Sequence, residues 1–247
     1  MYGIIAGLFV ILASIIGSLA GLFFKRITHR TNDMILGFAS GVMLTAAFLG
    51  LLPTAFEQFR PIPVAVGSAG VFAGAFLISL IDRFVPHIHF DGGHMKESEA
   101  KGHGSRVLLL IIAIAIHNIP EGLATGIVFS GGLTDSAVMV AVSMIVQKIP
   151  EGLIVAVPLL GMGMKRSKAF LLSLLIAFMM LPGIIAGVLL GTLPSLLSSF
   201  FYAFTFGAII YVVSDEIIPE SHEHGYQRAA TFSLIVGVII VVLMQHI

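Results

Sequence analysis

The chain has 247 residues, of which 57% are hydrophobic and only 11% are charged, and its formal net charge is zero. A soluble domain carries about 25% charged residues, so this composition excludes an ordinary soluble protein and indicates one integral-membrane domain over residues 1–247. The zero net charge gives no sign of nucleic-acid binding, and the absence of cysteine excludes disulfides and thiolate metal ligands.

Apolar segments follow one another along the whole chain. A bilayer core about 30 Å thick requires about 20 apolar residues per helix, which here predicts an all-α membrane protein with eight transmembrane helices. They are expected at residues 2–24, 34–58, 64–85, 106–129, 134–160, 168–191, 197–219 and 227–246. The first segment has no basic region before it, so we expect a spanning helix there rather than a signal peptide.

The basic residues favour one side of the predicted helices. All but two of the 13 lysine and arginine residues lie in or beside the loops that follow the first, third, fifth and seventh helices; the exceptions are Arg60 and Lys148. Because basic loops remain in the cytoplasm, this side is predicted to be cytoplasmic. Both termini would then lie outside the cytoplasm, in a multi-pass protein of the cytoplasmic (inner) membrane.

The longest predicted connection, residues 86–105, is polar and falls on the cytoplasmic side. It contains four histidines: His87, His89, His94 and His103. Such a loop either binds metal transiently or is merely solvated, and both interpretations also apply to His222 and His224. The small residues of the first three helices, such as Gly41 and Gly74, predict tight helix packing instead of chemistry.

Two related motifs lie inside the fourth and fifth predicted helices. Residues 117–122 read His-Asn-Ile-Pro-Glu-Gly, and residues 147–152 read Gln-Lys-Ile-Pro-Glu-Gly. Consecutive spanning helices run in opposite directions, so this repetition predicts an inverted repeat related by a pseudo-two-fold axis in the membrane plane. Transporters often place their substrate site at such an axis, on interrupted helices. The sequence therefore predicts a site between helices four and five.

The polar residues of the two motifs have the spacing of metal ligands. Residues four apart on a helix share a face, which pairs His117 with Glu121 and Gln147 with Glu151. A carboxylate at the bilayer centre costs about 2.5 kcal/mol or more, so two carboxylates there indicate a bound cation. Zn²⁺ suits this set of nitrogen and oxygen donors, and Fe²⁺, Mn²⁺, Co²⁺ and Cd²⁺ would also accept it. Interhelical hydrogen bonding alone, or a proton relay, are the alternatives.

The prolines and glycines of the motifs support a polar site. Pro120 and Pro150 cannot donate a backbone hydrogen bond, so each leaves a carbonyl one turn earlier available to water or an ion. Gly122 and Gly152 predict that neighbouring backbones approach closely.

The paired motifs closely resemble those of the ZIP (Zrt-, Irt-like protein) family of divalent-metal transporters. The resemblance covers essentially the whole chain, and it is strongest to the bacterial GufA-like branch, which begins the second motif with Gln. It implies a first metal position formed by His117, Glu121, Gln147 and Glu151.

The family's second metal position is incomplete in this chain. The resemblance implies Asn118, the residue at 148, the shared Glu151 and an acidic residue before a proline in the sixth helix. Here Lys148 and Leu181 occupy two of these places, and neither can ligate. We therefore predict a mononuclear site in which Lys148, beside Glu121 or Glu151, replaces the charge of the second ion. The alternative is a lysine that extends away from the site.

The seventh helix resembles the family's cytoplasmic-side segment, where acidic residues receive the ion on exit. Asp215 and Glu216 are the matching candidates, and Asp82 at the end of the third helix is expected to join them. Ordinary helix-end charges in water are the alternative interpretation.

Together these patterns predict a carrier that moves a divalent metal, with Zn²⁺ preferred, toward the cytoplasm by alternating access. The metal would be the substrate and not a cofactor, and the protein would not be an enzyme. The resemblance implies the direction of transport, a mechanism in which a site-bearing bundle slides against a scaffold, and a homodimer. An intramembrane metalloprotease requires His-Glu-x-x-His on one helix, which the chain lacks. A proton-coupled carrier of a small organic solute would require a larger polar cavity.

Overall fold

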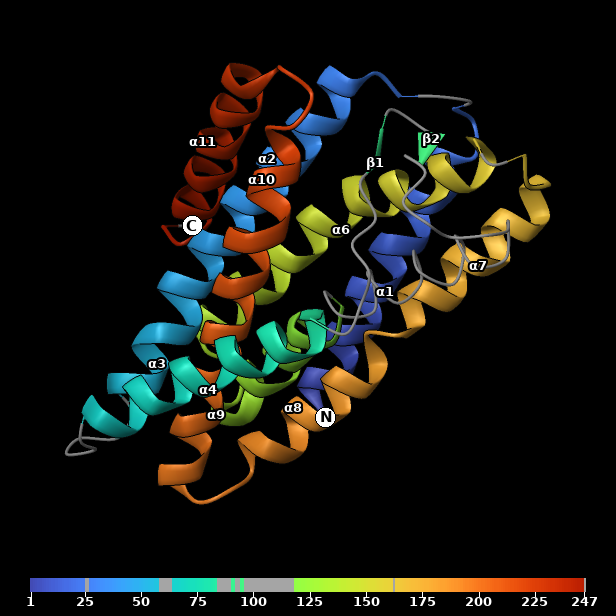
Figure 1. Cartoon of the computed structure of the whole chain (residues 1–247). Helices are drawn as coiled ribbons and strands as arrows, with labels where there is room; N and C mark the ends of the chain where they lie inside the picture. The colour runs from blue at the N-terminus through green and yellow to red at the C-terminus, as the bar shows by residue number, and fades with distance from the viewer. Residues whose placement is uncertain are drawn as a thin grey trace.

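The computed structural model describes residues 1–24, 27–57, 64–83, 90–91, 94–95, 118–161 and 163–246. Its α-helices are α1 (Tyr2–Gly21), α2 (His29–Ala46), α3 (Leu52–Glu57), α4 (Val64–Arg83), α6 (Asp135–Gly161), α7 (Arg166–Phe178), α8 (Leu181–Gly191), α9 (Ser195–Val212), α10 (Ile218–Ser221) and α11 (Gln227–Met244), as Figure 1 shows. Residues 118–127 form a further helix, followed by the 3₁₀ turn η2 (Val128–Gly131). Two strands of two residues each, β1 (Phe90–Asp91) and β2 (His94–Met95), pair antiparallel.

The all-α membrane class is confirmed by the long apolar helices. Within the described residues, seven helices are long and apolar enough to cross a bilayer: Tyr2–Gly21, His29–Phe56, Val64–Ile81, Asp135–Gly161, Arg166–Gly191, Ser195–Ser221 and Gln227–Met244. The fourth expected helix, at 106–129, is described only from residue 118. The sixth expected helix, at 168–191, is broken between Phe178 and Leu181, because Pro182 in the first turn of α8 cannot continue the hydrogen bonding of α7.

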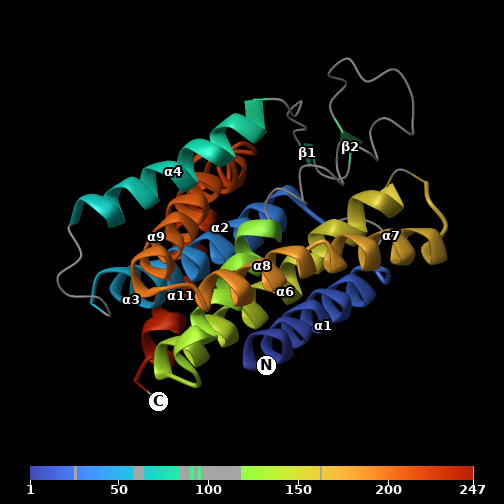
Figure 2. The ribbon, with the colours of Figure 1, turned by 90° about the horizontal axis from the view of Figure 1, so that it is seen from below.

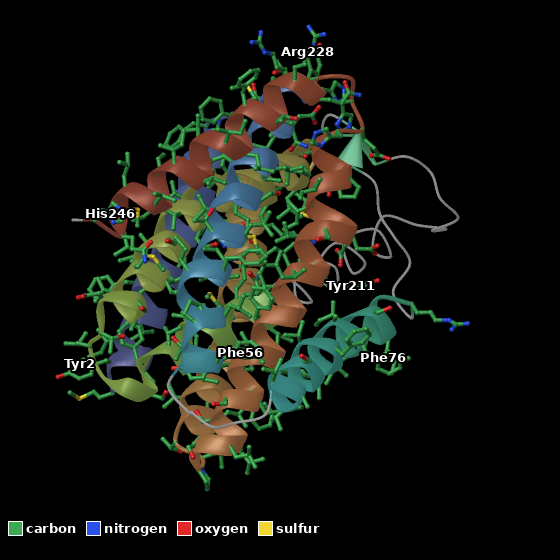
Figure 3. The ribbon with its side chains drawn as sticks, turned by 90° about the vertical axis from the view of Figure 1, so that its left-hand side faces the viewer. Tyr2, Phe56, Phe76, Tyr211, Arg228 and His246 are labelled. Atoms are coloured by element: carbon green, nitrogen blue, oxygen red, sulfur yellow. The ribbon has the colours of Figure 1, made fainter. Side chains whose placement is uncertain are left out.

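Large apolar side chains cover the outside of the helices. Phe72 and Phe76 of α4 are 81% and 66% exposed, and Phe232 of α11 is 69% exposed. Figure 3 shows the side chains around the bundle, with Phe76 pointing outward from α4. Such surfaces would be unfavourable in water, and they suit contact with lipid.

Glycines bring the helices that carry the motifs close to their neighbours. A Cβ atom at Gly152 of α6 would collide with the carbonyl oxygen of Ser14 in α1, and one at Gly122 would collide with that of Met180, just before α8. The close approach predicted from these glycines is therefore observed, although each faces a third helix and not the other motif. We call α1, the 118–127 helix, α6, α7 and α8 the site bundle.

The remaining helices pack together in the same way. A Cβ atom at Gly41 of α2 would collide with the carbonyl oxygen of Leu234 in α11, and one at Gly74 of α4 with that of Phe204 in α9. These contacts confirm the tight packing expected for the small residues. We call α2, α3, α4, α9, α10 and α11 the flanking bundle. In Figure 2 α4 lies at one edge of the molecule and α1 at the opposite edge.

The two bundles meet along α2, α6 and α9. Gly50, in the turn that follows α2, packs against Val140 of α6 in an apolar contact. Tyr202 of α9, which is 1% exposed, donates a 2.6 Å hydrogen bond to the carbonyl oxygen of Ile127. Its hydroxyl also lies 2.9 Å from the Ser130 hydroxyl. A polar contact thus joins the flanking bundle to the end of the 118–127 helix.

Two helices of the flanking bundle contain a π-helical turn. The turn η1 (Ala47–Leu51) joins α2 to α3, and η3 (Val213–Ile217) joins α9 to α10. Each turn ends one residue before a helical segment whose second residue is a proline, Pro53 or Pro219. Because proline cannot donate the usual backbone hydrogen bond, the wider turn accommodates it. Such π-turns are frequent at functional sites.

Candidate metal centre

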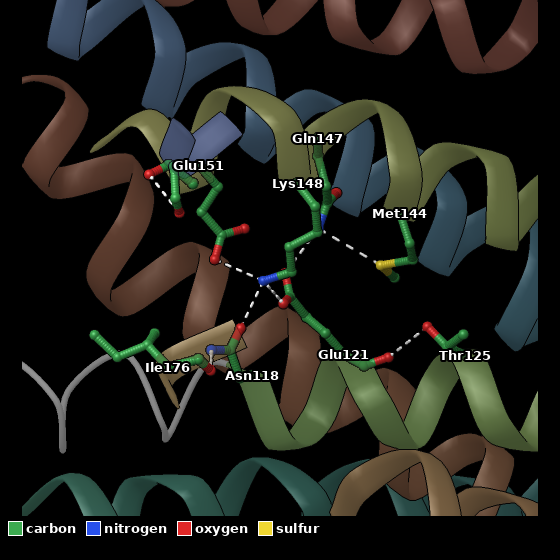
Figure 4. A network of polar contacts seen from close by, with 10 residues as sticks. Asn118, Glu121, Thr125, Met144, Gln147, Lys148, Glu151 and Ile176 are labelled. Carbon is green, nitrogen blue, oxygen red and sulfur yellow. Dashed lines mark hydrogen bonds and ion pairs between the residues drawn. The ribbon is translucent and has the colours of Figure 1, made fainter. Parts of the chain in front are cut away.

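Five polar residues of the two motifs converge between the 118–127 helix and α6 (Figure 4). These residues, which we call the polar cluster, are Asn118, Glu121, Gln147, Lys148 and Glu151. The first four are at most 3% exposed, whereas the side chain of Glu151 is 24% exposed. Charged groups are almost never buried without partners, so each charge in the cluster requires a compensating contact.

The ammonium group of Lys148 lies at the centre of the polar cluster. Its Nζ atom donates hydrogen bonds of 2.6 Å to Oδ1 of Asn118 and 2.6 Å to Oε1 of Glu151, and it forms an ion pair with Glu121. The sequence predicted contact with one of the two glutamates, and the lysine instead lies between both. The alternative of a lysine extending away from the site is not the observed conformation.

The side chain of Gln147 contacts the same glutamate from the other side. Its Nε2 atom donates a 2.7 Å hydrogen bond to Oε1 of Glu121, and Sδ of Met144 lies 3.5 Å from that nitrogen. The Oε1 atom of Gln147 is buried and has no hydrogen-bond partner among the described residues. An unsatisfied buried oxygen costs free energy, so this amide has an acceptor available for a cation.

Contacts from the surrounding helices orient the polar cluster. Nδ2 of Asn118 donates a 3.1 Å hydrogen bond to the carbonyl oxygen of Ile176 in α7, which turns its Oδ1 toward Lys148. Ser18 of α1 donates a 3.2 Å hydrogen bond to the carbonyl oxygen of Gly152. Pro150 lies inside α6, as the sequence predicted. These contacts hold the two motif segments without using the carboxylates of Glu121 and Glu151.

Several predicted site residues are not part of the described geometry. His117, the predicted imidazole ligand, lies outside the described residues, as do His87, His89 and His103. The backbone of Asp82 is in α4, but its side chain is not described. In the part of the chain that is described, no group of three or more His, Cys, Asp and Glu residues could hold a metal ion. A complete metal site in the described conformation therefore requires ligands other than these four residue types, or the imidazole of His117.

The predicted exit residues lie in the π-helical turn η3. Asp215 is exposed and accepts a 3.1 Å hydrogen bond from the hydroxyl of Tyr211, one turn earlier. Glu216 is half-buried in the same turn. The structure thus gives these two carboxylates an irregular helical setting, which the sequence did not indicate.

A second polar contact was not predicted from the sequence. Asp33 of α2 is fully buried, and its Oδ1 atom lies 2.8 Å from Nδ1 of His224, in the loop before α11. The ring of His29 stacks on that of His224 at 4.5 Å between centroids. The pair ties this loop to α2, so His224 is not merely solvated. The sequence pattern that could have indicated a polar contact here is the four-residue spacing of His29 and Asp33 at a helix start.

The polar cluster has the properties of a cation site. Two carboxylates and the amide of Asn118 surround the ammonium group of Lys148, and the amide of Gln147 contacts one of those carboxylates. Gln147, Lys148 and Glu151 lie in α6, which is long and apolar enough to cross a bilayer. The side-chain oxygen atoms of the cluster outnumber those that one lysine requires, since an ammonium group can donate only three hydrogen bonds. The arrangement therefore suits a divalent metal that is bound and released.

Comparisons with known proteins agree with this chemistry. The sequence model of the ZIP zinc transporter family matches residues 1–106 and 89–245. The chain is 32% identical to the zinc transporter GufA of Myxococcus xanthus, over 98% of this chain and 97% of that protein. It is 31% identical to the zinc transporter ZIPB of Bordetella bronchiseptica, over 96% of this chain and 78% of the relative. It is also 31% identical to the zinc transporter ZupT of Chlorobium chlorochromatii, over 94% and 92% of the two chains. The chain therefore belongs to the ZIP family of zinc transporters, which carry divalent metal as substrate and are not enzymes.

Proposed function

We propose that this transporter carries Zn²⁺ toward the cytoplasm through one metal site between the 118–127 helix and α6. The ligands are Glu121, Glu151, Gln147 and His117. The observation that carries the proposal is the buried carboxylate of Glu121, which is held by the Gln147 amide on one oxygen and by Lys148 on the other. The amide nitrogen of Gln147 and the ammonium group of Lys148 both lie where a cation would also be stabilised.

The site holds one metal ion in this proposal, because Lys148 takes the place of a second. Its Nζ atom is bonded to Asn118, Glu121 and Glu151, and Asn118 and Glu151 are residues that the family resemblance assigns to the second metal position. With neutral His117, one divalent ion beside Lys148 and two carboxylates gives a net charge of +1. A second divalent ion would raise this to +3, which a low-dielectric site does not sustain.

Transport proceeds in this proposal by movement of the site bundle against the flanking bundle. Close backbone contacts at Gly122 and Gly152 lie within the site bundle, and those at Gly41 and Gly74 lie within the flanking bundle, so each bundle is expected to move as a unit. The repeated motifs on two consecutive helices support an inverted repeat about the site. Asp215 and Glu216 in η3, with Asp82, receive the ion on the cytoplasmic side, and the protein acts as a homodimer in the lipid bilayer.

The topology can be tested by labelling, because the chain contains no cysteine. We expect Ser105→Cys, in the polar loop assigned to the cytoplasm, to be protected from an impermeant thiol reagent in intact cells with a permeabilised outer membrane. The matched control is Leu133→Cys, whose side chain is 62% exposed in the loop before α6. It is expected to react from outside. Labelling of Ser105→Cys together with protection of Leu133→Cys would show that the orientation is reversed.

Transport itself is tested by uptake into proteoliposomes containing the purified protein. We expect zinc to accumulate inside and unlabelled zinc in excess to compete, while small organic acids and amines at the same concentration do not. Cadmium, manganese, cobalt and iron(II) in the same assay rank the substrates. Uptake of an organic solute that is independent of metal would support the rival carrier and contradict the proposal.

A further inference from the structure

We propose that Met144 is a further ligand of the transported ion and that its thioether makes the site prefer soft metals. This inference rests on the proposed function and concerns the chemical class of the substrate. Met144 lies on α6 three residues before Gln147 and is 1% exposed. The sequence gives no sign of it, because a methionine in an apolar segment ordinarily fills the core.

The geometry around Gln147 identifies the position of the ion. Its Nε2 atom lies 2.7 Å from Oε1 of Glu121 and 3.5 Å from Sδ of Met144. Dashed lines mark both contacts in Figure 4. The amide hydrogens, which have a partial positive charge, thus contact a carboxylate and a thioether at once. Both of these acceptors are metal ligands, so the nitrogen marks a place that a cation also suits.

The unsatisfied oxygen of the same amide could also become a ligand of the ion. Oε1 of Gln147 is buried without a hydrogen-bond partner among the described residues, whereas Nε2 has two acceptors. A half-turn of the amide would direct Oε1 toward Glu121 and Met144. The amide oxygen, the carboxylate and the thioether would then face one point, which is electrostatically unfavourable unless a cation lies there.

The donor set predicts which ions gain from Met144. Thioether sulfur is a soft ligand, and it adds more to the binding of polarisable ions such as Cd²⁺ than to that of Mn²⁺, which prefers oxygen. Zn²⁺ is borderline and is expected to lie between them. The glutamates attract every divalent ion, so the thioether would determine preference among ions more than overall binding.

The absence of cysteine makes the inference directly measurable. Any sulfur bound to metal in this chain must come from one of its 11 methionines. We expect X-ray absorption of the cadmium-loaded protein in detergent to show one sulfur neighbour. Met144→Leu, which keeps the volume and apolar character, is expected to lose that sulfur and to lower the ratio of Cd²⁺ to Mn²⁺ affinity about tenfold.

Two further variants control this experiment. Met139→Leu changes another buried methionine of α6 and is expected to keep the sulfur signal and the affinity ratio. Met144→Gln replaces the sulfur by an amide oxygen of similar reach and is expected to shift preference toward Mn²⁺. A sulfur signal that persists in Met144→Leu, or no sulfur signal in the cadmium-loaded wild type, would overturn the role of Met144. In either case, binding that still depends on Glu121 leaves the proposed function standing, whereas binding independent of Glu121 removes both.

Discussion

Replacing Glu121 by glutamine is expected to lower zinc affinity by about a hundredfold or more and to abolish transport. The substitution keeps the shape of the side chain and removes one of the two carboxylates that the proposed site offers. The buried Glu121 also carries the ion pair with Lys148, so the variant leaves that ammonium with Glu151 and Asn118 alone. Removing one charged partner of a buried ligand costs about 3 kcal/mol of binding free energy, which corresponds to about a hundredfold in affinity.

Zinc titration of the purified variants by calorimetry measures this effect. The matched control is Glu223→Gln, the same chemical change at an exposed position in the loop before α11, which is expected to bind as the wild type does. His117→Ala and Glu151→Gln each remove one proposed donor and are expected to lower affinity at least about tenfold. Wild-type affinity in all three site variants would contradict the proposed ligand set.

Aspartate in place of Lys148 is expected to convert a one-ion site into a two-ion site. With neutral His117, two divalent ions beside three carboxylates give a net charge of +1, the same as one ion beside Lys148 and two carboxylates. The new carboxylate would lie near Asn118, Glu121 and Glu151, which now surround the ammonium group. The stoichiometry of zinc binding is expected to rise from one to two.

Removal of the charge without a new ligand has a different consequence. Lys148→Met keeps most of the volume but leaves two carboxylates facing each other without a cation, which is expected to destabilise the metal-free protein by about 3–5 kcal/mol. Zinc is expected to restore most of this loss, since it supplies the missing charge. Thermal unfolding with and without zinc measures both effects, and Lys168→Met at an exposed position is the control. Equal stability of Lys148→Met and Lys168→Met without zinc would show that Lys148 does not neutralise the site.

Much of the fold could be predicted from the sequence because it depends on local properties. Apolar length indicated the spanning helices, and the small residues indicated where they pack closely. Spacing by four residues predicted that Gln147 and Glu151 share one face of α6. In the structure, Gln147 contacts Glu121 and Glu151 contacts Lys148 within the polar cluster. These properties follow from periodicity and side-chain size, which require no knowledge of the partner helix.

The remaining features depend on contacts between distant parts of the chain. The position of Lys148 between both glutamates follows from the distance and register of two helices, which a motif alone does not specify. The contact of Asp33 with His224 joins residues 191 positions apart. Met144 resembles any core methionine until its sulfur is placed beside the Gln147 amide. The π-turns before Pro53 and Pro219 depend on how each helix absorbs its proline within the packed bundle.

The most direct test of a one-ion site held by Glu121 and balanced by Lys148 is anomalous diffraction from crystals of the wild-type protein soaked in zinc. We expect one strong anomalous peak between the 118–127 helix and α6, next to Glu121 and Gln147, with Lys148 still bonded to Asn118. Two well-occupied peaks about 4 Å apart and bridged by Glu151 would contradict the account, because Lys148 would then have given way to a second metal ion.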